Sequence, residues 1–287
     1  MEYSYRINYI LSAILLIVLT SCIREDYDNC PDYGKYPVIF IDADTNLQRE
    51  DYRVIIKVFE QNNSSHVLTV NYIIRAGERE LYSDKTLKLY PGYYTFKAIK
   101  SNNILNYNDD LLRMVNGYAC LSIDLSEKIK KAPKNQLNMK FKLSNSLIRI
   151  ACNMDNEAKN LFKIINVEIS APDDSNVFLN IITGKSNYSQ EVTEYYDSCH
   201  LETEPYIYYY YSVPIVRSKY LNFKFTFNEL STQKVSSIYT RVFLSSDIEQ
   251  GKVYDFHFDI TPQGISYRKT TIMDWETIVY DPQIHIN

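Results

Sequence analysis

The stretch Leu137-Asn-Met-Lys-Phe-Lys-Leu143 alternates apolar and polar residues without exception. Successive side chains on a strand point to opposite faces, so this pattern predicts a β-strand with one face buried and the other in water. Gly251-Lys-Val-Tyr-Asp-Phe-His-Phe-Asp-Ile260 repeats the alternation near the other end of the chain. Thr86-Leu-Lys-Leu-Tyr-Pro-Gly-Tyr-Tyr-Thr-Phe-Lys-Ala-Ile99 predicts a hairpin, because Pro91 and Gly92 suit the two central positions of a tight turn.

Short segments of the same kind recur along the chain, separated by turn-forming residues. The 27 tyrosines and 12 phenylalanines suit a pleated, half-buried surface. Long apolar stripes of helical period are absent from the sequence, and only residues 111–115 are compatible with a helical turn. The other predicted strands are residues 38–41, 53–60, 147–152, 163–169, 177–182, 206–213, 221–227 and 239–243. Many short strands with turns between them predict an all-β sandwich protein.

Residues 1–21 are predicted to be a signal peptide. The apolar run Ile10-Leu-Ser-Ala-Ile-Leu-Leu-Ile-Val-Leu19 follows Arg6, and its ten residues are too few for a spanning helix, which needs about 20. The run ends in Leu19-Thr20-Ser21-Cys22, the order of a lipoprotein signal, in which small side chains admit the peptidase and the thiol of Cys22 carries the lipid. The alternative is an uncleaved anchor helix with a chance cysteine. Two or three acyl chains would hold the protein stably, since each buried methylene contributes about 0.8 kcal/mol.

Residues 22–36 are predicted to be a lipidated tether. Cys22 is followed by Ile23-Arg24-Glu25-Asp26-Tyr27-Asp28. A basic residue and then acidic ones resemble the signal that sends lipoproteins of the Bacteroidetes to the outer face of the outer membrane. We therefore expect a lipid-anchored protein of the outer membrane that faces the cell surface, and an ordinary solvated tether is the alternative.

Removal of the signal peptide leaves 287 − 21 = 266 residues, which is comfortable for two domains. Ser144-Asn-Ser146 interrupts the strand pattern, which places the boundary between residues 144 and 156. We therefore predict an N-terminal β-sandwich over residues 37–147 and a C-terminal β-sandwich over residues 148–287.

The balance of charge argues against nucleic acid as a partner. The formal net charge is −4 and the pI is near 5.7, whereas nucleic-acid binding needs a concentrated basic surface. The basic stretch Lys128-Ile-Lys-Lys-Ala-Pro-Lys134 is interpreted as a solvated loop. With Cys22 acylated, four cysteines remain: Cys30, Cys120, Cys152 and Cys199. An exported protein can form disulfides and four cysteines allow three pairings, but the spacing is unlike a small disulfide framework, so we expect mostly buried free thiols.

Motifs of catalysis and of phosphate or dinucleotide binding are absent from the sequence, so we predict no enzyme and no cofactor. The histidines are His66, His200, His257 and His285, and none has a partner at metal-ligand spacing. Adjacent residues such as Cys199 and His200 would point to opposite faces of a strand. We therefore predict no metal site.

Three further features each have a functional and a structural interpretation. Asp42-Ala-Asp44-Thr-Asn46 begins like a calcium loop, but Leu47 and Arg53 stand where an EF-hand needs glycine and glutamate, so a turn is favoured over a calcium site of another kind. Tyr208-Tyr-Tyr-Tyr211 is interpreted as ordinary packing on one face and a wet edge on the other, with a sugar-stacking platform as the alternative. Trp275 is interpreted as a core or strand-end anchor rather than a ligand contact.

Three local patterns together resemble the FimB/Mfa2 family of fimbrial anchor lipoproteins, within the fimbrillin-like group of the Bacteroidetes. They are Cys22-Ile-Arg-Glu-Asp-Tyr-Asp-Asn-Cys30-Pro31, then Leu89-Tyr-Pro-Gly-Tyr-Tyr-Thr-Phe96, and last residues 251–265 followed by Thr271-Ile-Met-Asp-Trp-Glu276. The resemblance implies two transthyretin-like β-sandwich domains and a role in anchoring or assembling a fimbrium (a pilus) at the outer membrane. It also implies fimbrial subunits as partners, bound by strand addition at an open sheet edge. The alternative is a glycan-binding surface lipoprotein of a polysaccharide-uptake system.

Overall fold

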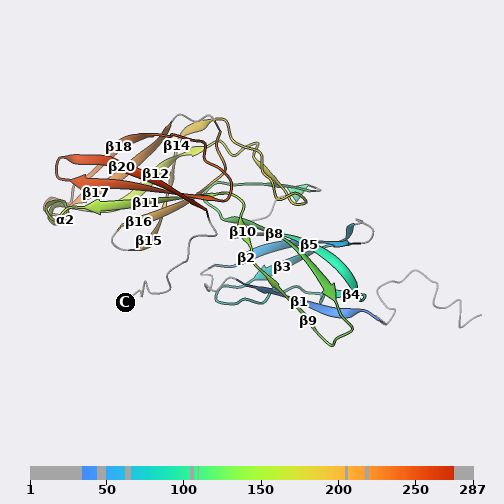
Figure 1. The fold of residues 1–287 in the computed structure, drawn as a ribbon. Helices are drawn as coiled ribbons and strands as arrows, with labels where there is room; N and C mark the ends of the chain where they lie inside the picture. Colours follow the sequence, from blue (N-terminus) through green and yellow to red (C-terminus); the bar gives the residue numbers. More distant parts are fainter. Residues whose placement is uncertain are drawn as a thin grey trace, which may run out of the picture.

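The computed structural model describes residues 34–43, 50–61, 66–103, 107–108, 110–203, 206–216 and 220–274. These residues fold almost entirely into β-strands, and the strands form two sandwiches, the second above the first in Figure 1. The predicted all-β sandwich fold is confirmed. Cys22, Cys30, Trp275 and His285 lie outside the described residues, so their predicted roles stay predictions.

The first sandwich packs a five-stranded sheet against a three-stranded sheet. Alternate residues of both sheets, including Phe40, Val58 and Phe96, form one buried cluster, as the period of two requires. The five-stranded sheet has the order β10 (Lys142–Leu143), β8 (Cys120–Ile129), β5 (Gly92–Ser101), β2 (Tyr52–Glu60) and β3 (His66–Ile74). The three-stranded sheet has the order β4 (Lys88–Leu89), β1 (Tyr36–Asp42) and β9 (Asn135–Met139).

The second sandwich packs a five-stranded sheet against a four-stranded sheet around a core rich in phenylalanine. Phe223, Phe225 and Phe258 are buried there, with Phe258 within 5.1 Å of both other rings. The five-stranded sheet has the order β15 (His200–Thr203), β16 (Ile207–Ser212), β11 (Ser146–Met154), β19 (Lys252–Thr261) and β20 (Gly264–Asp274). The four-stranded sheet has the order β14 (Val192–Ser198), β12 (Phe162–Pro172), β17 (Tyr220–Glu229) and β18 (Val235–Phe243). A short helix, α2 (Asn156–Leu161), is capped by Asp155.

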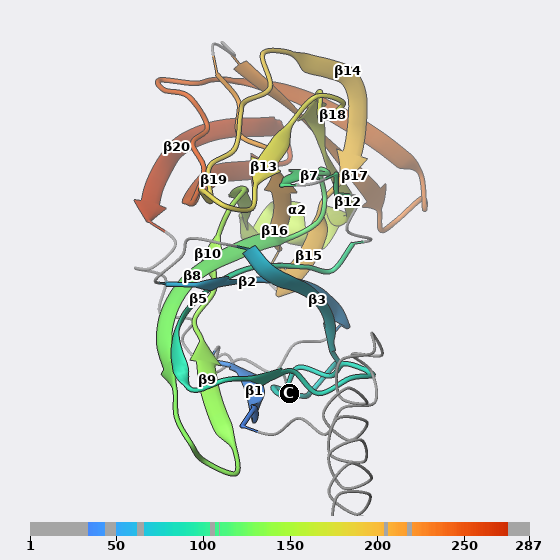
Figure 2. The same ribbon diagram turned by 90° about the vertical axis from the view of Figure 1, so that its right-hand side faces the viewer.

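The two sandwiches share one device. In each, the first strand runs parallel to a strand late in that sandwich: β1 pairs with β9, and β11 pairs with β19. Seen in Figure 2, the four-stranded sheet with β14 and β18 lies at one end of the molecule, and β1 and β9 lie at the other. The molecule is therefore elongated, with a distal sheet in the second sandwich.

Several sequence predictions need correction. The predicted hairpin at residues 86–99 is wrong, because β4 pairs with β1 in one sheet while β5 belongs to the opposite sheet. Gly92 does not have the positive φ expected of the turn and already pairs with Ile129. The alternating stretch 137–143 is likewise divided between β9 and β10, which lie in different sheets. Residues 111–113 form a strand, β7 (Leu111–Arg113), rather than a helical turn.

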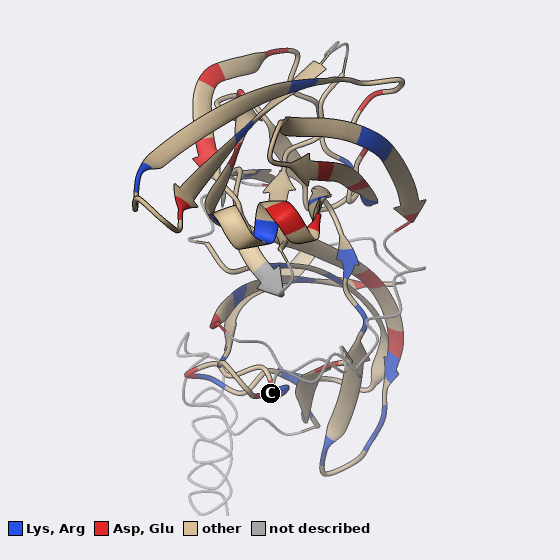
Figure 3. Cartoon of the chain, turned by 90° about the vertical axis from the view of Figure 1, so that its left-hand side faces the viewer, with Lys and Arg blue, Asp and Glu red and all other residues tan. Residues whose placement is uncertain are grey.

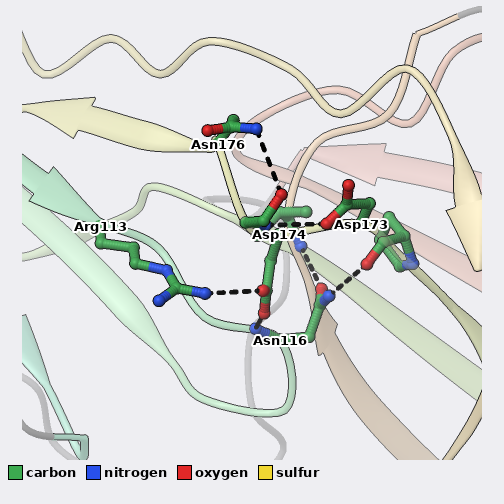
Figure 4. A network of polar contacts seen from close by, with 8 residues as sticks. Arg113, Asn116, Asp173, Asp174 and Asn176 are labelled. Atoms are coloured by element: carbon green, nitrogen blue, oxygen red, sulfur yellow. Dashed lines mark hydrogen bonds and ion pairs between the residues drawn. The ribbon is translucent and has the colours of Figure 1, made fainter.

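A small sheet and a polar network join the two sandwiches. Strands β13 (Phe178–Asn180), β7 and β6 (Tyr107–Asn108) form the sheet, and a buried apolar cluster that includes Ile99, Leu112 and Leu179 packs at this junction. Within the network, shown in Figure 4, the Asn116 side chain donates to the carbonyl of Pro172 at 2.7 Å and accepts from the amide of Val213 at 3.0 Å. The backbone N–H of Asn116 donates to the Asp174 carboxylate at 2.9 Å, and the Arg113 guanidinium contacts the same carboxylate at 3.4 Å. One asparagine thus connects three segments.

Candidate assembly surface

Every open sheet carries two edge strands, and an edge strand presents backbone N–H and C=O groups that a further strand can bind. In the distal sheet of the second sandwich, β18 is an edge strand, since among the described residues its only strand partner is β17. The ladder between them runs without interruption from Asn228 opposite Val235 to Tyr220 opposite Phe243. A nine-residue edge of this kind is a template for strand addition.

Four of the described strands at the end of a sheet have seven or more residues: β3, β14, β20 and β18. The pairing of β3 with β2, of β14 with β12 and of β20 with β19 each contains a register shift, whereas the pairing of β18 has none. A bulge twists an edge and is one of the devices by which proteins prevent edge pairing. Charged residues are another device, and Arg241 is the only charged residue of β18. Its guanidinium lies 4.1 Å from the centre of the Tyr220 ring and donates to Asn222 at 2.9 Å, so it is held over the sheet face.

Large apolar side chains are concentrated on this edge strand. Four of its nine residues leave much of their side chain in water: Phe243 at 74%, Tyr239 at 62%, Val235 at 57% and Ile238 at 39% exposed. Exposed clusters of apolar side chains are characteristic of interaction sites. The same strand therefore combines an open backbone edge with uncovered apolar surface.

Ile238 shows how the core opens at this edge. It pairs with Phe225, whose side chain is fully buried, so Ile238 is on the core side of the sheet and yet is partly exposed. Its neighbour on the same side, Ser236, is also exposed, and only Val242 of this face is buried. An added strand could place alternate apolar side chains over Ile238 and complete the core there.

The outer face of the distal sheet carries an aromatic and charged cluster. The rings of Tyr196 on β14 and Tyr239 on β18 meet edge to face at 5.8 Å, above an ion pair of 2.7 Å between Lys224 and Glu168. The hydrogen bond from Lys224 to Glu168 raises the pKa of the lysine, and partial burial raises the pKa of Tyr196. These side chains contact one another across the outer face of the sheet. They therefore form an ordered polar and aromatic surface beside β18.

The tyrosine run on β16 packs on both of its faces, one buried and the other half-buried instead of fully wet. Tyr208 and Tyr210 are buried in the second core, as the packing interpretation required. Tyr209 and Tyr211 pack against the cluster of the first sandwich, and Tyr209 also stacks on His200 at 5.2 Å. The hydroxyl of Tyr210 donates to Asp197 at 2.7 Å, and burial together with that carboxylate raises the tyrosine pKa.

The candidate calcium loop is described only in part. Asp42 of the candidate calcium loop forms a buried ion pair with Lys100 at 2.6 Å, and residues 44–46 of that motif lie outside the described residues. Among the described residues, no set of three or more histidine, cysteine or carboxylate side chains could hold a metal ion. Within the same residues, no helix has the length and apolar character to cross a membrane.

Cys120, Cys152 and Cys199 are buried free thiols, as predicted for these three residues. Burial raises the pKa of Cys120 and of Cys152 to about 12 and also raises that of Cys199. Thiolates are the reactive species, so the burial and the raised pKa values of these cysteines both disfavour their reaction in the folded protein.

The sequence pattern predicts only part of the edge strand β18. It predicted a strand over residues 239–243 and missed residues 235–238, because Val235-Ser-Ser-Ile238 has no alternation of apolar and polar residues. That lack of alternation is itself the signal, since a strand with neither face buried has no reason to alternate.

The fold is shared with solved bacterial structures. A protein from Bacteroides uniformis, described as a "putative cell adhesion protein", superposes with a TM-score of 0.61 at 14% identity over 86% of this chain and 100% of its own. Proteins from Bacteroides fragilis and Bacteroides ovatus with the same description each superpose with a TM-score of 0.54 at 11% identity over 84% of this chain, and over 97% and 96% of their own. No protein-family model matches the sequence, and no curated protein matches it. At these identities the similarity establishes a common fold.

Proposed function

We propose that this protein is a non-enzymatic surface lipoprotein that anchors or assembles a fimbrium, and that β18 receives a strand from a fimbrial subunit. The observation that carries the proposal is the uninterrupted, apolar edge of β18 in the distal sheet. The lipoprotein order at Cys22 and the resemblance to fimbrial anchors support it. So does a fold shared with proteins described as cell adhesion proteins.

The arrangement of the molecule suits this role. The tether enters the first sandwich at β1, and β18 lies at the opposite end of the molecule in Figure 2. A lipid on Cys22 would then hold the first sandwich near the membrane and direct β18 away from it. Strand addition supplies backbone hydrogen bonds along the strand, and alternate side chains provide specificity.

A lysine on the core side of β18 tests the proposal. Ile238→Lys places a charge where an added strand would bury its side chains, and since Ile238 is already partly exposed the fold should persist. We expect cells that make this variant to release fimbriae into the medium. Val67→Lys is the matched control, because Val67 is a similarly exposed apolar residue on the edge strand β3 of the first sandwich. Fimbriae that stay fully attached in the Ile238→Lys cells would refute the role of β18.

The lipid is tested separately. Cys22→Ser should give an unprocessed precursor that does not take up labelled palmitate, because the thiol is the site of acylation. A variant that still matures and labels would show that the N-terminal interpretation is wrong. A fimbrillin-type gene beside this one would favour the anchor, whereas an outer-membrane transporter and glycosidases would favour glycan uptake.

A further inference from the structure

The end of the first sandwich farthest from the second sandwich is strongly basic. Strand β8 begins with Cys120 in the junction cluster and ends at Ile129, and ten residues of strand span about 30 Å. Figure 3 shows Lys and Arg along the connection from β8 to β9, which extends from this end. Its lysines and those of the adjacent strand ends form what we term the basic end: Lys35, Lys88, Lys128, Lys130, Lys131 and Lys134.

Strand pairing, rather than chance proximity in a loop, brings these lysines together. Pro37 pairs with Lys88, and Val38 pairs with Asn135. The start of β1, which follows Lys35, therefore lies between Lys88 on β4 and the start of β9. The buried side chain of Asn135 fixes the loop between β8 and β9, since it accepts from the backbone N–H of Lys130 at 2.9 Å and donates to the Lys130 carbonyl at 3.1 Å. The loop therefore holds its charges in a fixed place.

Two exposed tyrosines lie among the lysines. Tyr90 and Tyr93 are 55% and 52% exposed. The Lys35 ammonium lies 5.5 Å from the centre of the Tyr90 ring, and the Lys128 ammonium lies 5.0 Å from the centre of the Tyr93 ring. Tyrosine and lysine side chains have an apolar body and a polar tip, which suits the boundary between lipid headgroups and acyl chains.

The charge of the basic end is opposite to that of the whole chain. Among the described residues, two carboxylates, Glu60 and Glu127, flank Tyr94 at its margin, and the six lysines outnumber these two by four. The formal net charge of the whole chain is −4, so this excess of lysine is a local concentration of positive charge. Such a concentration attracts a surface that bears phosphates.

We propose that the basic end lies flat on the anionic lipid headgroups of the membrane to which the protein is tethered, with its lysines against their phosphates. The inference deepens the proposed lipid anchor and rests on it for its biological setting. Eleven residues separate Cys22 from Gly34, and an extended chain of that length reaches at most about 40 Å, so a lipid on Cys22 would keep the basic end within that distance of the membrane. Lysines near an anionic surface each strengthen binding about fivefold. A second contact of this kind complements acyl chains and would set the orientation of the molecule.

Vesicle co-sedimentation of the chain from residue 23 onward tests the inference without the lipid. This chain keeps every described residue, and its folding is to be checked by circular dichroism before the binding assay. We expect it to bind vesicles of phosphatidylcholine with about 30% phosphatidylglycerol and not vesicles of phosphatidylcholine alone. Binding should fall as salt rises from about 0.1 M to about 0.5 M, because the Debye length shortens.

Charge reversal locates the contact. Lys130→Glu/Lys131→Glu/Lys134→Glu should weaken binding to anionic vesicles by at least about 100-fold, given about fivefold for each lysine lost. Lys159→Glu/Lys163→Glu/Lys234→Glu changes the net charge equally at exposed lysines of the second sandwich and should change binding only a few-fold. Equal loss in the two variants, or equal binding to both kinds of vesicle, would overturn the inference. Neither result depends on acylation of Cys22 or on fimbriae, so the proposed function would stand or fall separately.

Discussion

Lys100 and Asp42 form an ion pair in the interior of the first sandwich, and it offers a quantitative test of the fold. The side chains are 3% and 2% exposed, and the Lys100 ammonium also lies 5.0 Å from the centre of the Tyr52 ring and 5.2 Å from that of Phe141. Asp42 ends β1 and Lys100 is in β5, so the pair connects the two sheets. Removal of Lys100 or Asp42 would deprive the other buried charge of this ion pair.

The size of the penalty can be worked out. Loss of one partner of a buried pair typically costs about 3–5 kcal/mol. The lone group can escape by changing protonation, which limits the cost: neutralising an aspartate of ordinary pKa about 3.9 costs about 4 kcal/mol at pH 7 and about 1.5 kcal/mol at pH 5. Neutralising a lysine of ordinary pKa about 10.4 costs about 4.6 kcal/mol at pH 7 and about 1.9 kcal/mol at pH 9.

The two single variants should therefore respond to pH in opposite directions. We expect the Lys100→Met deficit in the free energy of unfolding to shrink from pH 7 to pH 5, and the Asp42→Asn deficit to shrink from pH 7 to pH 9. The double variant buries no charge and should be more stable at pH 7 than either single variant. Urea unfolding followed by circular dichroism measures all three against the parent protein. Additive losses in the double variant, or single losses below about 1 kcal/mol, would refute this reasoning.

Three other predictions concern the junction, a buried hydroxyl and the thiols. Asn116→Ala leaves the buried amide of Val213 without its acceptor and should lower the free energy of unfolding by about 2–4 kcal/mol, measured by urea unfolding; a loss under about 0.5 kcal/mol would contradict the network. Burial raises the pKa of Tyr72 from 10.0 to about 12, and its hydroxyl has no hydrogen-bond partner among the described residues. Stability should therefore fall as pH rises from about 10 towards 12, because only the unfolded state ionises readily there, and Tyr72→Phe should weaken that fall without destabilising the protein at pH 7. The three described thiols should react with Ellman's reagent at pH 8 only as fast as the protein unfolds, and rapid labelling of the native protein would show that they are accessible.

The sequence predicted which faces of the strands are buried, and it did so from the alternation of residue types. The buried positions Leu137 and Met139, and equally Phe256 and Phe258, follow the period of two directly. The same period carries no information about the partner of a strand, because both sheets of a sandwich present an apolar face to one core. For that reason residues 86–99 looked like a hairpin although the turn carries the chain from one sheet to the other.

For the candidate functional residues, too, local features could be predicted from the sequence and features of the whole topology could not. Cys22 was predicted from local chemistry alone, since a lipoprotein signal is read in an extended chain before folding. The edge at β18 could not be identified, because an edge is defined by the absence of a neighbouring strand, which is a property of the whole topology. The expectation that one side of the tyrosine run on β16 faces water missed a contact of the same kind. Tyr209 and Tyr211 on that side pack against the first sandwich, whose residues are distant in the sequence.

Cross-linking at β18 in intact cells tests the central claim most directly. A photoreactive phenylalanine analogue in place of Tyr239, which is 62% exposed on β18, should join the protein to a fimbrial subunit that mass spectrometry can identify. The same analogue in place of Tyr82, an exposed tyrosine of the first sandwich, should not. Strand addition at β18 predicts an adduct with a fimbrial subunit from the first position alone. An absence of that adduct, or equal yields from the two positions, would contradict the account.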